Sequence, residues 1–196
     1  MNRALIVYGT RYGATASTSE EIANVLRNEG FDVRTVNAKE DKVRDIAEYE
    51  LVIVGSGIQI DRWTGEPEKF LNRFQKELAK KKVALFVSSG TQALIEHEGN
   101  PEAIGRGRRK WLDEKAAKHD LRPVALGLFG GVWDYNNMPW WSKKAMTETK
   151  REIEAAGFKE VSPGVYDTRD WEAIRSWARE LVGKVRTEAV PSAFNE

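Results

Sequence analysis

The sequence predicts an α/β protein, a three-layer sandwich with a five-stranded parallel β-sheet between two layers of helices. Apolar runs alternate along the 196 residues with longer segments whose apolar side chains recur at helical spacing. The runs at residues 51–55 and 83–87 are continuously apolar, which is typical of parallel strands buried on both faces. The predicted strands end in residues rich in glycine, serine, threonine or aromatic rings, which favours a ligand site at that edge.

The first strand is expected at residues 3–8, and a turn leads from it into a helix over residues 19–28 whose apolar residues form one stripe. Gly30 suits the C′ position that ends such a helix, because glycine adopts a positive φ without steric cost. Residues 31–36 alternate apolar and polar side chains, so this run is expected to be an edge strand.

Apolar runs and apolar residues at helical spacing also predict the remaining strands and helices. Pro67 suits the first position of a helix, where its missing N–H needs no partner. The remaining strands are expected at residues 51–55, 83–87 and 122–129, the remaining helices at residues 43–48, 67–78, 101–119, 140–156 and 171–185, and a short extended or turn segment at residues 161–166.

Right-handed crossovers give these five strands the order 2-1-3-4-5, since the second strand is the least apolar and fits an edge. In such a sheet the ligand lies beyond the carboxyl ends of the strands, near the switch point between strands 1 and 3. The loops that begin at Gly9, Ser56, Ser88 and Gly130 are therefore expected to meet around one site.

Composition narrows the class of protein. The charges of the 31 basic and 30 acidic residues nearly cancel, and no aromatic residue interleaves the basic run at residues 106–110. Neither observation favours nucleic-acid binding. The absence of cysteine excludes disulfides, thiolate-bound clusters and a catalytic thiol. With no signal-peptide pattern and no apolar run of the ~20 residues that a membrane span needs, we expect a cytoplasmic protein. Residues 1–186 are expected to form one domain and residues 187–196 a flexible tail.

The turn at residues 9–15 carries the strongest functional signal. Backbone N–H groups and hydroxyls at a helix N-terminus converge on phosphate, and Thr10 and Thr15 supply two hydroxyls here. The turn lacks both the Gly-Lys-Ser/Thr ending of a P-loop and the Gly-x-Gly-x-x-Gly spacing, so it suits a single monophosphate. The alternative is an ordinary strand-to-helix turn in which one threonine caps the helix.

Other functions of the same topology fit less well. A phosphoacceptor domain needs an aspartate at the end of strand 3, where the chain has Gly55 and Ser56. A serine hydrolase needs Gly-x-Ser-x-Gly, which this segment lacks. The two histidines, His97 and His119, have no metal-ligand spacing and are expected at the surface, so no metal site is predicted.

The turn resembles the phosphate loop of flavodoxins, and the whole chain resembles the flavodoxin-domain family that includes menaquinone-dependent protoporphyrinogen dehydrogenases. The residues that carry the resemblance are 8–15, 55–58 and 167–172. The resemblance implies a flavodoxin-like three-layer sandwich, FMN as cofactor and redox chemistry at the flavin. Residues 10–15 would hold the phosphate of FMN. Residues 56–58 would border one side of the flavin, and the loops from Ser88 and Gly130 would border its other side. The cofactor-binding residues expected on this basis are Thr10, Arg11, Tyr12, Gly13, Ala14, Thr15, Ser56, Gly57, Ile58, Gln59, Trp63, Ser88, Ser89, Gly90, Thr91, Gly130, Gly131, Trp133 and Tyr135. No catalytic residue is expected.

Several of these residues have two interpretations. Gly57 is either a turn residue with positive φ or a site where a backbone group reorients on flavin reduction. Trp63 and Trp133 either stack on the flavin or fold back on the core. Trp140 and Trp141 are either buried or meet a partner, a substrate ring or a membrane interface. The basic run at residues 106–110 is either a solvated helix start or a docking surface for an acidic redox partner.

Three functions remain open at this point. The first is an electron carrier that shuttles single electrons between redox partner proteins by means of FMN. The second is an FMN-dependent oxidoreductase that passes electrons from a porphyrinogen to a quinone. The third is a flavin-free interaction module, which would leave the phosphate-loop signal without a purpose.

Overall fold

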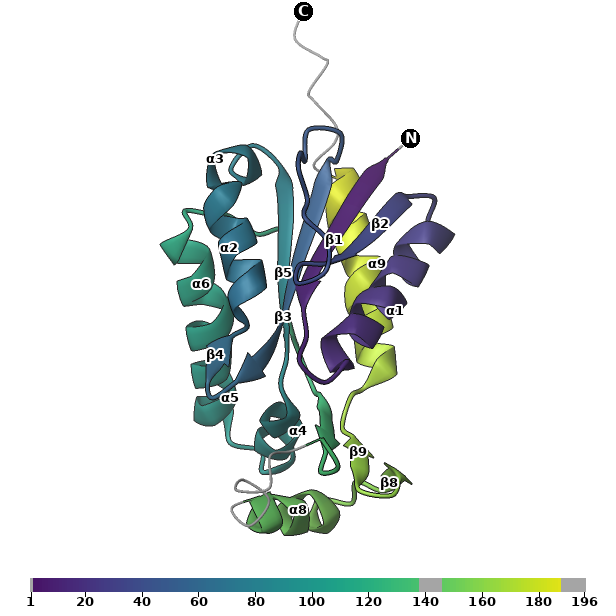
Figure 1. Ribbon diagram of the computed structural model, residues 1–196, viewed down its shortest axis with the longest axis vertical. Coiled ribbons are helices and arrows are strands. Elements are labelled where there is room, and N and C mark those ends of the chain that lie inside the picture. Colours follow the sequence, from purple (N-terminus) through teal and green to yellow (C-terminus); the bar gives the residue numbers. More distant parts are fainter. Residues whose placement is uncertain (1, 138–145, 188–196) are drawn as a thin grey trace, which may run out of the picture.

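The computed structural model describes residues 2–137 and 146–187. Trp140, Trp141 and residues 188–196 of the expected tail lie outside the described residues. Five parallel strands form the main sheet in the order β2-β1-β3-β5-β6, which confirms the predicted order 2-1-3-4-5 of the principal strands (Figure 1). Their bounds are β1 Arg3–Gly9, β2 Asp32–Asn37, β3 Leu51–Gln59, β5 Lys82–Ser88 and β6 Ala125–Phe129.

Helices cover both faces of this sheet (Figure 1). On one face, α1 (Ala14–Asn28) and α9 (Trp171–Thr187) bury apolar stripes against alternate strand residues. The other face is covered by α2 (Gly65–Arg73), α3 (Gln75–Leu78) and a long broken helix. This broken helix consists of α5 (Pro101–Arg108), the π-helical turn η1 (Arg109–Asp113) and α6 (Glu114–Lys118).

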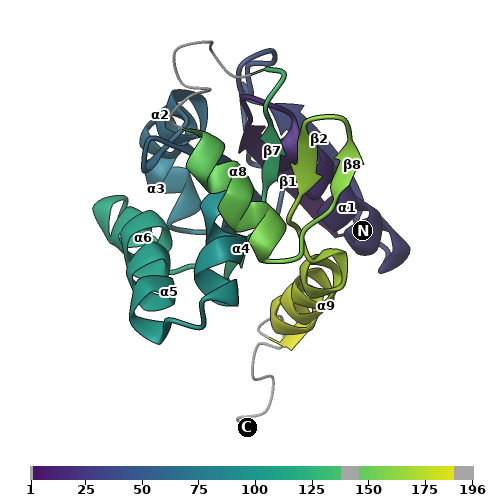
Figure 2. The ribbon, with the colours of Figure 1, turned by 90° about the horizontal axis from the view of Figure 1, so that it is seen from below.

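A second, smaller sheet lies beyond the carboxyl ends of the main strands, as Figure 2 shows from below. It consists of β7 (Val132–Asp134), β9 (Val165–Asp167) and β8 (Glu160–Ser162), all antiparallel. The helices α4 (Gly90–His97) and α8 (Met146–Ala155) pack with it around Leu94, Ile153 and Tyr166. The segment expected to be extended at residues 161–166 is therefore the hairpin of this sheet.

Two local predictions are wrong. Residues 43–48 form no helix: the segment between β2 and β3 is irregular, and it buries Val43, Ile46 and Tyr49 one by one. Pro67 is the third residue of α2 and not the first, a position within the first turn where its missing N–H still costs no hydrogen bond. The expected helix end at Gly30 is confirmed, since its φ is +87°.

His119 is a further correction, because this histidine lies in the core and not at the surface. Its side chain is 1% exposed at the end of α6, and its Nε2 atom has no hydrogen-bond partner in the described residues. Burial, followed by the nearby charges of Lys118 and Lys115, lowers the pKa of His119 below its ordinary value of 6.5. His97, by contrast, is exposed at the end of α4.

Candidate functional site

The turn between β1 and α1 has the geometry of an anion site. Gly13 precedes the first residue of α1 and has a φ of +88°, a left-handed conformation that favours glycine. Its N–H donates to the hydroxyl of Thr10 at 2.9 Å, which fixes the turn. Thr15, 1% exposed, lies in the first turn of this 15-residue helix, whose N-terminal N–H groups and dipole favour a negative charge.

A strained turn follows β3. Gly57 lies inside the strand, in register with Ser88, and has no positive φ, which excludes the first of its two interpretations, a turn residue. The chain turns instead at Ile60 and Asp61, with φ of +46° and +60°, before β4 (Arg62–Trp63) pairs back onto β3. Two successive left-handed residues make a tight hairpin, and a β-branched residue there is strained.

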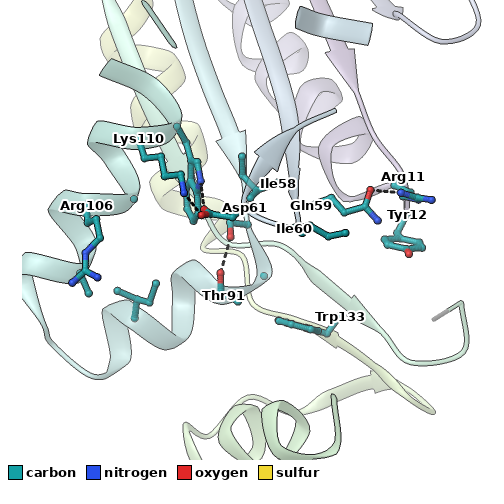
Figure 3. A pocket seen from close by; sticks show the side chains of 16 residues that line it. Arg11, Tyr12, Ile58, Gln59, Ile60, Asp61, Thr91, Arg106, Lys110 and Trp133 are labelled. Carbon is teal, nitrogen blue, oxygen red and sulfur yellow. Dashed lines mark hydrogen bonds and ion pairs between the residues drawn. The ribbon is translucent and has the colours of Figure 1, made fainter. Parts of the chain in front are cut away.

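The Asp61 carboxylate ties this turn to the broken helix (Figure 3). Lys110 forms an ion pair with Oδ2, and the indole N–H of Trp111 donates to Oδ1 at 2.7 Å. Both donors are successive residues of η1. The hydrogen bond from Lys110, more than any other contact, lowers the pKa of Asp61, so this carboxylate is ionised at neutral pH.

Three glycines near the carboxyl ends of β3, β5 and β6 allow neighbouring groups to approach the backbone closely. A Cβ atom on Gly90 would lie 2.5 Å from Nε1 of Trp133, and one on Gly131 would lie 2.8 Å from the nitrogen of Gly90. A Cβ on Gly57 would be 3.1 Å from the hydroxyl of Thr15. Larger residues at these positions would fill the space between the loops.

Between these loops lies a cavity of about 790 Å³, and a smaller one of about 80 Å³ adjoins the phosphate loop. The larger volume lies within the usual range for small-molecule sites. The sequence-predicted residues that line one or both cavities are Thr10, Arg11, Tyr12, Ala14, Thr15, Gly57, Ile58, Gln59, Ser88, Ser89, Gly90, Thr91, Gly131 and Trp133.

The structure leaves five predicted residues outside both cavities. Trp63 is a correction: it packs in the core against α2, and its indole N–H donates to the carbonyl of Trp111 at 2.7 Å. Tyr135 packs edge-on against Tyr166 under the small sheet. The other three are Gly13, Ser56 and Gly130. The N–H of Gly13 donates to Thr10, the hydroxyl of Ser56 is hydrogen-bonded to that of Thr64, and the backbone of Gly130 lies close to Thr168.

Sequence reasoning missed the wall that α5 and η1 contribute. Ala103, Arg106, Gly107 and Lys110 follow one another at helical spacing and line the cavity. Figure 3 shows Arg106 and Lys110 on this wall, and Arg106 forms no ion pair within residues 2–137 and 146–187. The spacing of this face was present in the sequence, but the basic residues around it suggested a solvated helix.

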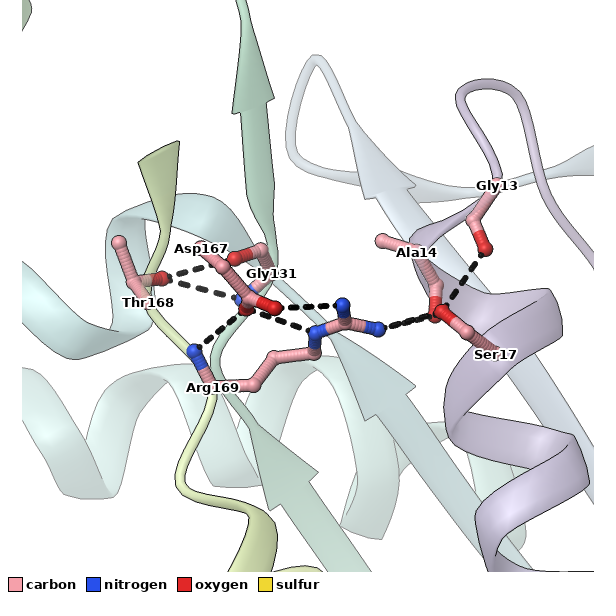
Figure 4. A network of polar contacts seen from close by, with 7 residues as sticks. All are labelled: Gly13, Ala14, Ser17, Gly131, Asp167, Thr168 and Arg169. Carbon is pink, nitrogen blue, oxygen red and sulfur yellow. Dashed lines mark hydrogen bonds and ion pairs between the residues drawn. The ribbon is translucent and has the colours of Figure 1, made fainter. Parts of the chain in front are cut away.

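A network of polar contacts joins the small sheet to the phosphate loop (Figure 4). Arg169, whose side chain is 7% exposed, pairs with Asp167 at 2.7 Å. Its Nη1 atom donates to the carbonyl of Ala14 and to the hydroxyl of Ser17. Thr168 accepts from the N–H of Gly131 at 3.2 Å and donates to its carbonyl. The C-terminal part of the chain thus holds two of the loops that build the site.

Comparison with known proteins identifies the family. The model of the flavodoxin domain matches residues 5–159. The chain belongs to the flavodoxin family. A flavodoxin from Clostridium beijerinckii is 31% identical over 87 residues, which are 43% of this chain and 63% of that protein. The chain therefore spans less than two thirds of this curated flavodoxin.

Solved flavodoxins share the fold. A short-chain flavodoxin associated with a non-canonical PDU bacterial microcompartment superposes with a TM-score of 0.56 at 14% identity, over 94% of this chain and 99% of that one. The Streptococcus pneumonia TIGR4 flavodoxin gives a TM-score of 0.54 at 15% identity, over 93% and 99% of the two chains.

Flavodoxins bind FMN, and the residues present fit that cofactor. The phosphate loop supplies the anion site, and the large cavity beside it is lined by aliphatic and aromatic side chains that suit a flat ring. Two polar atoms at the cavities, the hydroxyl of Ser88 and the indole nitrogen of Trp133, are buried without a partner in the described residues. Such orphaned donors favour a ligand that accepts hydrogen bonds.

Two further findings concern other classes of site. No group of histidine, aspartate and glutamate side chains in the described ranges could hold a metal ion. Among the same residues, no helix has the length and apolar character to cross a membrane.

Proposed function

We propose that this flavodoxin is an electron carrier that passes single electrons between redox partner proteins by means of bound FMN. FMN supplies the redox chemistry, and the protein binds, orients and shields it. Thr10, Thr15 and the N-terminus of α1 hold the phosphate, and Trp133 excludes water from the ring. The turn at Ile60 and Asp61 borders the opposite edge of the cavity.

One observation carries the proposal. Asp61 is the only carboxylate that lines either cavity in the described part of the chain, and it is engaged by both Lys110 and Trp111. An ionised carboxylate has no proton to donate, and one whose two oxygens already accept from a lysine and an indole is a weak base. Single-electron transfer needs no acid or base, whereas oxidation of an organic substrate ordinarily does.

The test is stepwise anaerobic reduction of the FMN-loaded protein, followed by absorbance. A carrier accumulates the one-electron-reduced form of the flavin over a wide range of potentials. Direct conversion from oxidised to fully reduced flavin would contradict the carrier function.

A second candidate, an FMN-dependent oxidoreductase acting on a quinone or porphyrinogen, is favoured by the α5 wall. The cavity extends past the loops to Ile95, Ala103 and Arg106, so that an apolar arm ends at a guanidinium with no ion-pair partner among the described residues. Turnover of a quinone or porphyrinogen that is lost in Arg106→Gln would establish this function instead.

A further inference from the structure

A second cavity lies apart from the cofactor site. It has a volume of about 420 Å³ and shares no lining residue with the two cavities described above. One wall is the irregular segment that follows β2, from Ala38 to Val43, and the other is formed by Phe70 of α2 and by Phe74, which follows that helix. This volume is within the range of small-molecule sites.

The rim of this cavity is basic. Lys39, Lys42, Lys69 and Arg73 line it. None of the three lysines forms an ion pair in the part of the chain that the structure describes. Two acidic residues, Asp41 and Glu66, also line it, so the rim carries a formal net charge of +2 (four cations less two anions). Such a field favours an anion with more than one negative charge.

The floor of the cavity is apolar and fixed. Val7, Val43, Phe70 and Phe74 are all buried and form part of the core below α2. Arg73 donates to the carbonyl of Val43 at 3.1 Å and lies over the ring of Phe74, so it fastens the irregular segment to α2. The donors of the lysines remain available to a ligand.

The irregular segment explains why the cavity exists at all. The extended path of the segment places Val43 in the core and leaves Lys39 and Lys42 at the rim. The backbone of the segment is anchored at its start, where the N–H groups of Ala38 and Asp41 donate to Tyr8 and Asn37.

We propose that this cavity binds a small organic anion, an apolar or aromatic body that carries a phosphate or carboxylate group. The apolar body contacts the floor between Val43 and Phe70, and the anionic group is held by Lys39, Lys42 and Lys69. The site is independent of the electron-carrier function, because none of these residues lines the cofactor cavities.

Calorimetric titration of the FMN-loaded protein with 1-naphthyl phosphate tests the proposal, since bound FMN keeps the probe from the phosphate loop. We expect saturable binding at a stoichiometry of one. Titrations with 1-naphthoate and with neutral 1-naphthol show whether a dianion, a monoanion or the apolar body alone is recognised. The proposal requires that 1-naphthol bind at least about tenfold more weakly than the phosphate.

The variant Lys42→Gln/Lys69→Gln should weaken naphthyl phosphate binding by about tenfold or more, because hydrogen bonds to charged groups are among the stronger polar contacts. The matched control is Lys76→Gln/Lys80→Gln, which removes the same charge from α3 and the residues after it, outside the cavity. The control should bind as the unchanged protein does. All four lysines are exposed, so folding is expected to be unaffected.

Absence of saturable binding to the unchanged protein would overturn the proposal. So would an equal loss in both double variants, which would mean that the probe responds to net charge alone. Displacement of FMN by the probe, visible as a rise in flavin fluorescence, would show that it occupies the cofactor site instead.

Discussion

The guanidinium of Arg169 donates to the carbonyl oxygen of Ala14 at 3.1 Å, across 155 residues of sequence. The same side chain donates to the hydroxyl of Ser17 at 2.6 Å and is paired with Asp167. The first turn of α1 is therefore positioned by a residue that precedes the last helix. The phosphate loop can be recognised from consecutive residues, but the side chain that holds it in place, Arg169, lies far away in the sequence.

Removing this support should affect both stability and cofactor binding. In Arg169→Met the partly buried Asp167 loses its partner, and we expect a loss of about 1–3 kcal/mol in the free energy of unfolding. FMN affinity should fall as well, because the first turn of α1 is no longer held. Urea unfolding and fluorescence titration with FMN measure the two effects. Arg175→Met, which breaks surface pairs with Glu21 and Glu172, is the control. Unchanged FMN affinity in Arg169→Met would remove this residue from the site's support.

The two loop threonines should each contribute to FMN affinity. Thr10→Ala loses the acceptor for the N–H of Gly13, and Thr15→Ala loses a buried hydroxyl at the start of α1. Hydrogen bonds to a charged group are worth roughly 1.5–3 kcal/mol each, so the double variant should bind FMN weaker by a few kcal/mol. Thr187→Ala, at the far end of the molecule, should bind normally. If the double variant binds as tightly as the unchanged protein, the phosphate lies elsewhere.

Replacement by glycine should relieve backbone strain in the turn after β3 at only one of its two positions with positive φ. Ile60 is 86% exposed and has a positive φ, so Ile60→Gly removes strain without uncovering the core. We expect a gain of up to about 1 kcal/mol in the apoprotein, since such strain costs roughly 1–3 kcal/mol and glycine loses part of the gain to entropy. Asp61→Gly should destabilise instead, because the contacts from Lys110 and Trp111 are lost. Thermal unfolding of both variants would contradict the strain argument if Ile60→Gly melts lower.

Gly90 should be intolerant of a side chain. The Cβ atom of Gly90→Ala would meet the indole of Trp133 at 2.5 Å, so the ring must leave its present place. If that ring shields the flavin, Gly90→Ala and Trp133→Leu should both raise flavin fluorescence and shift the potential of the second electron upward. A change in Gly90→Ala without one in Trp133→Leu would assign the effect to the backbone and not to the ring.

The buried His119 predicts a dependence of stability on pH. Its pKa in the folded protein lies below 6.5, so the unfolded chain binds a proton more readily. Stability should therefore be greatest above about pH 6.5, should fall as the pH decreases through that value, and should level off below the folded-state pKa. Urea midpoints between pH 7.5 and 5 measure the slope, which His119→Gln should reduce and His97→Gln should leave unchanged. Equal slopes in all three proteins would exclude His119 as the source.

The main sheet could be predicted from the sequence because its central strands are continuously apolar, its edge strand alternates apolar and polar residues, and its order follows from connection rules. The helix at residues 43–48 was wrong because Val43, Ile46 and Tyr49 recur every third residue. This spacing of apolar residues is expected for one turn of a helix. It is equally expected for an extended loop in which every third side chain is buried in the core. Only the packing of α2 against this segment distinguishes them.

The cofactor loops could be placed by their strand ends, but individual side chains could not. Trp63 belongs to a loop of the site and yet points into the core, since the β3–β4 hairpin reverses its direction. Arg106 and Lys110 belong to a basic helix that looked solvated, and only the three-dimensional path of α5 turns them to the cavity. Arg169 gave no signal of its partner in α1, because no local pattern encodes a contact across 155 residues.

The π-helical turn at Arg109–Asp113 has a consequence for single-codon deletions. Trp111 reaches Asp61 before this turn ends, and Lys115 reaches Glu68 at 3.0 Å after it. A π-helical turn holds one residue more than an α-helical turn, so removing one codon here would restore ordinary helical bonding and leave α5 and α6 in nearly the same rotational register. A codon removed elsewhere in the broken helix would instead rotate its two halves by about 100° relative to each other, and one of the two contacts would face away from its partner. The wall of the cavity should therefore tolerate the loss of Arg109 far better than the loss of a residue of α5 or α6.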